Sequence, residues 1–387
     1  MIDWRTKLIH AEPALPDAYR SLSTPVYRGS TTLFPSVAVA QDHWDQHRVG
    51  YTYGLYGTPT ALELAARICD LESGMRTFLT PSGQAALALV NFALLRSGDH
   101  VLIPASIYKP HAWLATRMLS GFGIQTTFYE PGAGSGISKL FRRNTRLVWT
   151  ESPGSVTMEV QDVRAIAEAA RSAGAKVALD NTWSAGVLFD AFEHGVDVTM
   201  QALTKYAGGH GDLLMGSVTV ADEDLYEKIG SAHQVAGYAV SPDDCSLVLR
   251  GLQTMGVRLE AARIAALEIA GWLSRRPEVE RVLHPAFESC PGHEIWKRDF
   301  KGSSGVFSIV LRPGPDKERV HAFADALQLF EPGYSWAGTT SLVMTYDLAG
   351  EDGRPAYDHR LVRLSIGLES PADLIADLER AFAVLAS

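Results

Sequence analysis

The sequence predicts an α/β protein built around a mixed, mostly parallel β-sheet. Short apolar segments typical of buried strands recur up to about residue 220, and helical segments separate them. A second observation concerns polar side chains: Tyr108, Asp180 and Lys205 each follow one of these strands. Because ligands bind beyond the carboxyl ends of the strands in such sheets, we expect one ligand site at this edge.

Composition restricts the class of protein. The chain has 387 residues, of which 46% are hydrophobic and 20% charged, as in an ordinary globular enzyme of two or three domains. A net charge of −9 argues against a nucleic-acid partner. The three cysteines show no CxxC pair, so we expect a reducing compartment and no metal or disulfide framework. The sequence shows neither a signal peptide nor an apolar run of the roughly 20 residues that a membrane span needs, which predicts a cytoplasmic protein.

The first 57 residues show no helical or strand periodicity and are interrupted by prolines. We expect an extended arm that lies on another surface, such as that of a partner subunit. A helix is predicted to follow over Ala61–Leu71, with Thr58 or Thr60 as its N-cap.

The next unit is a strand, Thr77–Thr80, then the turn Pro81–Gln84 and an apolar helix, Ala85–Leu95. A helix that begins directly after a strand presents free N–H groups and its positive dipole end to the turn, which favours an anion such as phosphate. A simple N-cap by Ser82 explains the same residues, and the two interpretations are compatible.

Buried strands and one amphipathic helix are predicted to continue this pattern. The helix covers Asp162–Ser172 and turns its apolar side inward. The strands are predicted at His100–Ile103, Gly121–Phe128, Arg146–Thr150, Lys176–Trp183, Val196–Leu203 and Met215–Val220.

Lys205 follows the strand Val196–Leu203 and precedes the glycine pair at 208 and 209. A lysine that leaves a packed strand here can point into a crevice, where loss of hydration lowers its pKa and frees its amine for Schiff-base chemistry. The alternative is an ordinary surface lysine beside a strand end.

The last third of the chain is predicted to form a separate unit. A long helix over Pro242–Leu273 leads out of the first unit, and strands are expected at Val306–Leu311 and Leu361–Leu368. Alternation in the last of these places Arg363 on the face opposite the apolar residues. This arginine needs an anionic partner, either a ligand carboxylate or an internal salt bridge with Glu369.

Pyridoxal phosphate would give each of these groups a separate role. Lys205 would meet its aldehyde, Asp180 its pyridine nitrogen, and Tyr108 the face of its ring. Arg363 would bind the carboxylate of an amino-acid substrate. The phosphate would be held by Gly83, Gln84 and Thr204.

Several separated motifs are similar to those of the cysteine/methionine-metabolism family of fold-type-I pyridoxal-phosphate enzymes, nearly from end to end. These motifs are Asp180–Trp183, Thr204–Tyr206, Glu151–Gly154 and Arg363–Glu369. Within that family, three stretches resemble the carbon–sulfur β-lyases: Asn181–Trp183, Tyr334–Trp336 and His293–Phe300.

The resemblance implies a large domain with a mostly parallel seven-stranded sheet flanked by helices, a smaller α+β C-terminal domain and an N-terminal arm. We place these at residues 58–250, 251–387 and 1–57. It also implies a homotetramer, built as a dimer of dimers, that acts on a small sulfur amino acid. Catalysis would involve Lys205, Tyr108 and Asp180. The substrate side would be lined by Arg363, Tyr334, Ser335 and Trp336, and Tyr53 would touch the phosphate in the neighbouring subunit.

One departure from the family concerns Leu55. The family usually has Tyr-Gly-Arg at this place, where Tyr53-Gly54-Leu55 stands here, and leucine cannot pair with phosphate. Other functions remain as alternatives. They are γ-elimination or cysteine and cystine desulfuration on the same scaffold, a non-catalytic cofactor-binding regulator, and a dehydrogenase, which the absence of a GxGxxG turn disfavours.

Overall fold

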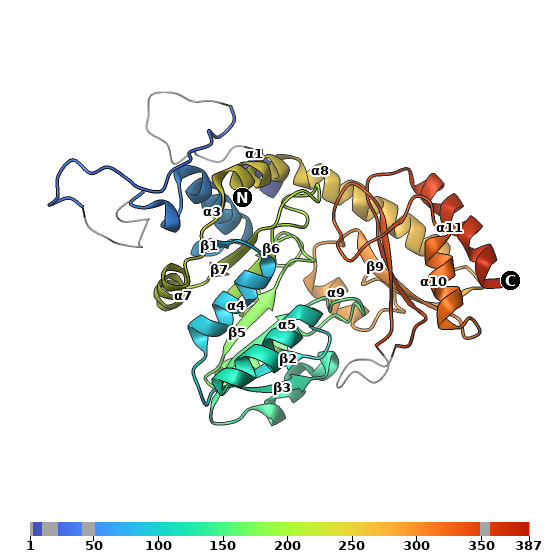
Figure 1. Ribbon diagram of the computed structural model, residues 1–387. Helices are drawn as coiled ribbons and strands as arrows, with labels where there is room; N and C mark the ends of the chain where they lie inside the picture. Colours follow the sequence, from blue (N-terminus) through green and yellow to red (C-terminus); the bar gives the residue numbers. More distant parts are fainter. Residues whose placement is uncertain (1–2, 10–21, 41–50, 349–356, 387) are drawn as a thin grey trace.

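Two β-sheets form the body of the molecule. The computed structural model describes residues 3–9, 22–40, 51–348 and 357–386. The strand order is β1-β7-β6-β5-β4-β2-β3 in the seven-stranded sheet and β10-β11-β12-β9-β8 in the five-stranded sheet. Figure 1 shows the long helix α8 (Pro242–Leu273) running from the side of the first sheet to that of the second.

The seven-stranded sheet confirms the predicted class. Six strands run parallel and β7 alone is antiparallel to its two neighbours. Most of these strands are buried on both faces, which explains why their sequences read as continuous apolar runs. Their bounds are β1 Arg76–Thr80, β2 His100–Pro104, β3 Gln125–Tyr129, β4 Thr145–Glu151, β5 Lys176–Asp180, β6 Val198–Ala202 and β7 Gly216–Val220.

Helices cover both faces of this sheet. Neighbouring residues of a strand point to opposite faces, and on β7 Val218 packs in the cluster that includes α4 (Gly83–Leu94), whereas Thr219 bonds Glu72 of α3 (Pro59–Glu72). Thr58 occupies the N-cap position of α3 without a side-chain hydrogen bond. The remaining helices of this unit are α5 Lys109–Trp113, α6 Val163–Ser172, α7 Glu223–Ala236 and the short turns η1 Gly54–Tyr56, η2 Leu114–Met118, η3 Leu119–Phe122, η4 Pro131–Leu140 and η5 Phe192–His194.

Several predicted strands, β3, β5, β6, β7 and β12 among them, are shorter in the structure than the sequence indicates. β5 ends at Asp180, because the backbone turns there and the Asp180 carboxylate accepts a hydrogen bond from the N–H of Thr182. β3 begins only at Gln125, after a short helical turn, and β12 (Leu361–Ser365) ends three residues before Leu368.

The second unit packs helices against one face of its own sheet. Its strands are β8 Val279–Leu283, β9 Val306–Leu311, β10 Glu331–Pro332, β11 Leu342–Tyr346 and β12. Its helices are α9 His293–Asp299, α10 Lys317–Asp325 and α11 Pro371–Ala386. The predicted domain boundary between residues 250 and 251 falls inside α8, which continues unbroken, so the division into domains stays a prediction.

The N-terminal region has two described parts that differ. Helix α1 (Trp4–Ile9) packs against α3 and α8 of its own chain and buries Leu8. Residues 22–40 instead form an extended, mostly exposed segment, much of which stands away from the body (Figure 1). Its start is held to the body, because Pro25 and Tyr27 bond the Thr60 hydroxyl of α3 and Arg28 pairs with Asp243 of α8. Among the described residues, no helix is both long and apolar enough to span a membrane.

Candidate active site

The predicted polar residues lie at one edge of the seven-stranded sheet. β4, β5 and β6 are parallel neighbours, and Glu151 at the end of β4 pairs in register with Asp180 at the end of β5. The lysine loop begins directly after Ala202, where β6 ends, and Tyr108 follows β2 at the same edge. The chain topology alone therefore gathers an amine, two carboxylates and a phenol.

A tight turn fixes the backbone of Lys205. Its N–H donates to the carbonyl of Ala202 at 3.0 Å, and its own carbonyl accepts from the N–H of Gly209 at 2.7 Å. The side-chain Nζ donates to Ser335 Oγ at 2.8 Å and lies 5.4 Å from the ring centroid of Trp336. Both partners come from the segment between β10 and β11, so Lys205 joins the two sheets.

The surroundings lower the pKa of Lys205 to about 8. Burial of the amine is the main cause, and the positive charge of Arg363 acts in the same direction. Asp180 opposes both effects. The lowered pKa agrees with the prediction from sequence, and about a tenth of the amine is uncharged at pH 7.

Asp180 is buried and held on one side only. Its Oδ1 accepts hydrogen bonds from the N–H and the hydroxyl of Thr182, and that hydroxyl accepts from the N–H of Ala202 at 3.0 Å. Within the described part of the chain, Oδ2 has no hydrogen-bond partner. Burial raises the pKa of Asp180 to about 6, against the effect of the Thr182 hydrogen bonds and the charge of Lys205. The free Oδ2 of Asp180 is therefore suited to accept a hydrogen bond from the protonated pyridine nitrogen of the predicted cofactor.

The N-terminus of α4 presents backbone donors. Ser82 caps the helix by accepting from the N–H of Ala85 at 3.0 Å, as the simpler interpretation predicts. The N–H groups of Gly83 and Gln84 donate to no acceptor in the described residues. A Cβ at position 83 would lie 2.8 Å from the Cβ of Ala202, so only glycine fits there. The turn therefore suits an anion.

The hydroxyl of Thr204, the third predicted phosphate ligand, already bonds the backbone of Met215. It donates to the Met215 carbonyl at 3.2 Å and accepts from its N–H at 3.1 Å. These bonds hold the lysine loop to the start of β7. The role of Thr204 toward a phosphate stays a prediction.

Tyr108 stands at the N-terminus of α5 and is 45% exposed. Its backbone N–H donates to Glu151 Oε2 at 2.7 Å, which orients the turn that carries the ring. Burial raises the pKa of the phenol, as do the charges of Asp180 and Glu151, while Arg363 opposes them. The ring is therefore neutral and free to stack on a flat ligand.

Arg363 is buried in β12 and directs its guanidinium at a loop. Its Nη2 donates to the carbonyls of Gly333, Tyr334 and Ser335 at 3.1, 2.7 and 3.2 Å. The alternative of a salt bridge with Glu369 is wrong, because Glu369 accepts hydrogen bonds from the N–H and hydroxyl of Ser341 instead. No carboxylate pairs with Arg363 anywhere in the described ranges, which leaves this cation available to a ligand.

Aromatic side chains surround this guanidinium. The ring of Tyr346 lies 5.4 Å from it, and Tyr334, which is 75% exposed, packs edge-on against Tyr346. Trp336 is partly buried and contacts Tyr206. The predicted substrate-side residues Tyr334, Ser335 and Trp336 thus lie beside Lys205 and Arg363.

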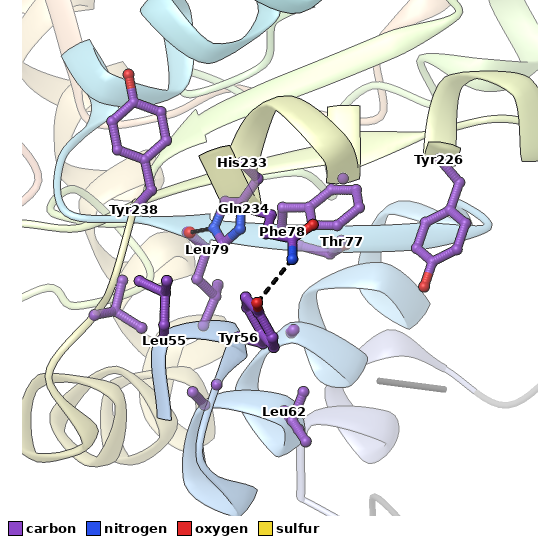
Figure 2. Close-up of a pocket in the computed structure, with 15 residues that line it drawn as sticks. Leu55, Tyr56, Leu62, Thr77, Phe78, Leu79, Tyr226, His233, Gln234 and Tyr238 are labelled. Atoms are coloured by element: carbon purple, nitrogen blue, oxygen red, sulfur yellow. Dashed lines mark hydrogen bonds between the residues drawn. The ribbon is translucent and has the colours of Figure 1, made fainter. Parts of the chain in front are cut away.

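Tyr53, which is predicted to touch the phosphate of a neighbouring subunit, does not lie beside the site residues of its own chain. It forms a β-bridge with Thr31 and packs against Tyr56, and among the described residues it makes no bond to Lys205, Asp180 or Tyr108. Leu55 lines a separate cavity between η1, α3, β1 and α7. Figure 2 shows this cavity, in which the Tyr56 hydroxyl accepts a hydrogen bond from Gln234 at 2.7 Å.

Sequence reasoning missed two groups that complete the site. The Thr182 hydroxyl orients Asp180, and the Glu151 carboxylate orients the Tyr108 turn. A signal for the first was available: a threonine two residues after an aspartate at a strand end can bond that carboxylate.

These groups fit pyridoxal phosphate. They comprise an amine of lowered pKa, a buried carboxylate with an open oxygen, free N–H groups at a helix N-terminus, and a buried guanidinium without a carboxylate partner. The family described as Cys/Met metabolism PLP-dependent enzyme matches residues 5–383. The chain belongs to this family.

Relatives and solved structures agree with that membership. A putative cystathionine beta-lyase of Rhizobium johnstonii is 44% identical over 98% of this chain and 95% of its own length. The cystathionine beta-lyase MetC of Escherichia coli is 39% identical over 98% of both chains. The structure of a Lactobacillus plantarum cystathionine gamma-lyase complexed with L-serine superimposes with a TM-score of 0.90 at 28% identity, over 100% of each chain. The fold and the cofactor class predicted from sequence are thereby confirmed.

Proposed function

We propose that this protein is a carbon–sulfur β-lyase that converts L-cystathionine and water to homocysteine, pyruvate and ammonia. The observation that carries the proposal is the environment of Lys205. Its amine has a pKa lowered to about 8 and donates a hydrogen bond to Ser335. The charge of Asp180 raises this pKa, and the charge of Arg363 lowers it. The names of the relatives support the choice of substrate.

The residues divide the reaction between them. Arg363 binds the substrate α-carboxylate through its free guanidinium edge, which fixes the orientation of the amino acid. The bound cofactor supplies an electron sink for the charge that develops at Cα. Asp180 keeps the ring nitrogen protonated through Oδ2, while Thr182 holds Oδ1. Lys205 removes the Cα proton as its uncharged amine, so the lowered pKa serves the step directly.

The departing sulfur receives a proton when the Cβ–S bond breaks. Lys205 carries the proton taken from Cα, and the neutral phenol of Tyr108 is the other donor at hand. The structure favours Lys205, because its nitrogen lies beside the substrate-side residues Ser335 and Trp336. A Tyr108→Phe variant tests the assignment: we expect it to retain turnover within about tenfold, the range of a single hydrogen bond.

A second candidate is γ-elimination, which the similarity to a gamma-lyase structure supports. Product analysis separates the reactions. β-Elimination of cystathionine yields pyruvate, whereas γ-elimination yields 2-oxobutyrate. Turnover of cysteine or cystine in preference to cystathionine would indicate a desulfurating lyase, and absence of turnover with all three would indicate a non-catalytic regulator.

We propose that the active assembly is a homotetramer, built as a dimer of dimers, in which the arm of one subunit reaches the site of its neighbour. Leu22, Leu33 and Val37 are almost fully exposed in the segment that stands away from the body, and such apolar side chains need a covering surface. Light scattering tests the mass, and a Tyr53→Ala variant that weakens cofactor binding would support the neighbour's contact to the phosphate.

The decisive experiment is turnover of purified protein supplied with pyridoxal phosphate. We expect a yellow protein that borohydride bleaches, with the label on Lys205, and pyruvate as the keto acid formed from L-cystathionine. A colourless protein, or label on another lysine, would overturn the proposal. We also propose a cytoplasmic role in methionine synthesis, which the three free cysteines and the homocysteine product support and cell fractionation tests.

A further inference from the structure

A second arginine without an acid partner lies behind the lysine loop. Arg258 projects from α8 and is 9% exposed. Its Nε donates to Thr254 Oγ1 at 3.1 Å, and its Nη2 donates to the carbonyls of Gly251 at 2.7 Å and Tyr206 at 3.0 Å. No ion pair of Arg258 exists among the described residues. Burying a cation that bonds only neutral acceptors costs free energy. The contacts of Arg258 indicate which part of the site it holds in place.

The loop that Arg258 contacts is the one that carries Lys205. Gly209 has a φ of +76°, and a Cβ there would lie 1.8 Å from Arg258 Nη1. A Cβ on Gly251 of α8 would lie 2.2 Å from the carbonyl oxygen of Ala207 and 2.5 Å from that of Gly208. The loop and α8 are therefore in direct backbone contact, with the guanidinium filling the space beside Gly209.

The residue next to Lys205 is held at both ends. Arg258 bonds the carbonyl of Tyr206, and the Tyr206 hydroxyl accepts from the N–H of Gly305 at 2.7 Å. The Tyr206 ring also packs against Trp336 at 5.6 Å between centroids. Since Tyr206 follows Lys205 directly, its fixed peptide sets the direction in which the Lys205 side chain leaves the backbone.

We propose that Arg258 is a positioning residue for Lys205, acting through the Tyr206 carbonyl. The planar guanidinium fixes the angle between α8 and the loop, which a single-point donor such as lysine does less well. The charged and polar groups that face the Lys205 amine are Asp180 from β5, Arg363 from β12 and Ser335 from the segment before β11. The inference rests on the proposed function for the role of Lys205, and adds Arg258 to the site.

The test compares Arg258→Met with Arg263→Met in the holoenzyme. Arg263 lies five residues further along α8 and pairs with Glu260 of the same helix, so its loss leaves the loop untouched. For Arg258→Met we expect kcat to fall at least about tenfold with KM changed less than about threefold, because small misplacements of a reacting group are costly. Arg263→Met should match the wild type in both constants.

A spectroscopic measurement separates positioning from stability. The visible absorption of the bound cofactor reports the ionisation of the lysine nitrogen, and its pH titration needs no substrate. We expect Arg258→Met to move the midpoint to higher pH, since a less constrained nitrogen is better hydrated. Arg258→Lys should restore part of the shift. A lower melting temperature with unchanged titration and kcat would show a purely structural arginine and overturn the inference.

Two further outcomes are covered. If Arg258→Met does not fold, Thr254→Val removes only the hydroxyl that orients the guanidinium, and an unchanged kcat and titration in that variant would overturn the inference. If the wild-type protein fails to cleave cystathionine, the proposed function fails, whereas a shifted titration midpoint in Arg258→Met would still support the positioning of Lys205. If the wild type cleaves cystathionine and Arg258→Met has an unchanged titration midpoint, the inference is overturned and the proposed function stands.

Discussion

The two sides of Lys205 are built in different ways. On the cofactor side, Asp180 belongs to a central strand, and the hydroxyl of Thr182 bonds both that carboxylate and the backbone of β6. On the substrate side, Tyr334 and Ser335 lie in an exposed segment between strands, held by the Nη2 group of Arg363. The first side is pre-organised by the sheet, where little can change without loss of the fold.

This difference indicates where specificity can vary. A loop tolerates substitution more easily than a central strand does, so relatives with other sulfur substrates can share the cofactor side and differ at the segment 333–336. Arg363 restrains that freedom, because it contacts the loop that lines the substrate side and remains open to the substrate itself. Substitutions on the cofactor side should therefore lower mainly kcat, and substitutions on the substrate side should raise mainly KM.

The largest effect is expected for Lys205→Ala, which removes the residue on which both sides act. We expect kcat to fall by at least about 10³, since a general base and the covalent attachment of the cofactor are lost together. Lys228→Ala is the control, because Lys228 pairs with Asp224 at the surface of α7, away from the site. Circular dichroism should show both variants folded. Turnover of Lys205→Ala near the wild-type value would contradict the assigned role.

Asp180→Asn tests the cofactor side alone. An amide keeps the hydrogen bonds of Thr182 but removes the negative charge that holds a proton on the ring nitrogen. We expect kcat to fall about 10²- to 10³-fold, the range for loss of one electrostatic stabiliser, with a small change in KM. Asp190→Asn, which alters a surface ion pair with Lys301, serves as the control. If both variants lower kcat equally, Asp180 does not have the assigned role of keeping the ring nitrogen protonated.

Arg363→Met tests the substrate side. Removing one partner of a buried charge pair typically costs about 2–5 kcal/mol, so kcat/KM should fall roughly 30- to 5,000-fold, mainly through KM. The loop carbonyls of Gly333, Tyr334 and Ser335 also lose their donor, and substrate discrimination should decline with affinity. Arg360→Met is the control, three residues away, where the guanidinium pairs with Glu280 and Asp358. A loss confined to kcat would place Arg363 on the cofactor side instead.

The sequence predicts the cofactor side better than the substrate side, for a physical reason. Asp180 is the last residue of one buried strand and Lys205 follows another, and strand ends can be located from apolar runs in a parallel sheet. The partner of Arg363 depends instead on which loop faces β12, a contact between distant parts of the chain, so the salt bridge with Glu369 could be excluded only by the structure. The end of β5 and the contact of Arg258 depend on side-chain hydrogen bonds, which hydrophobic periodicity does not predict.

The smallest predicted effect concerns the ionisation of Lys205, on which both sides act. In cofactor-free protein, pyridoxal phosphate reacts with the uncharged amine, so the rate of uptake should rise with pH and level off above about 8. Ser335→Ala should move this midpoint to lower pH, because the lost hydroxyl accepts a hydrogen bond from the ammonium and favours the charged form. The rates at pH 7 should differ less than about tenfold, which corresponds to one hydrogen bond.

Variants of the two sides should move the same midpoint in opposite directions. Asp180→Asn removes a charge that raises the pKa of Lys205 and should lower it further, whereas Arg363→Met removes a charge that lowers the pKa and should raise it. Stopped-flow absorbance measures all four proteins, with Ser274→Ala, at the exposed end of α8, as the control. A wild-type midpoint near the unperturbed 10.5 would mean a fully hydrated amine, and then neither side of the site could act on Lys205 as its geometry requires.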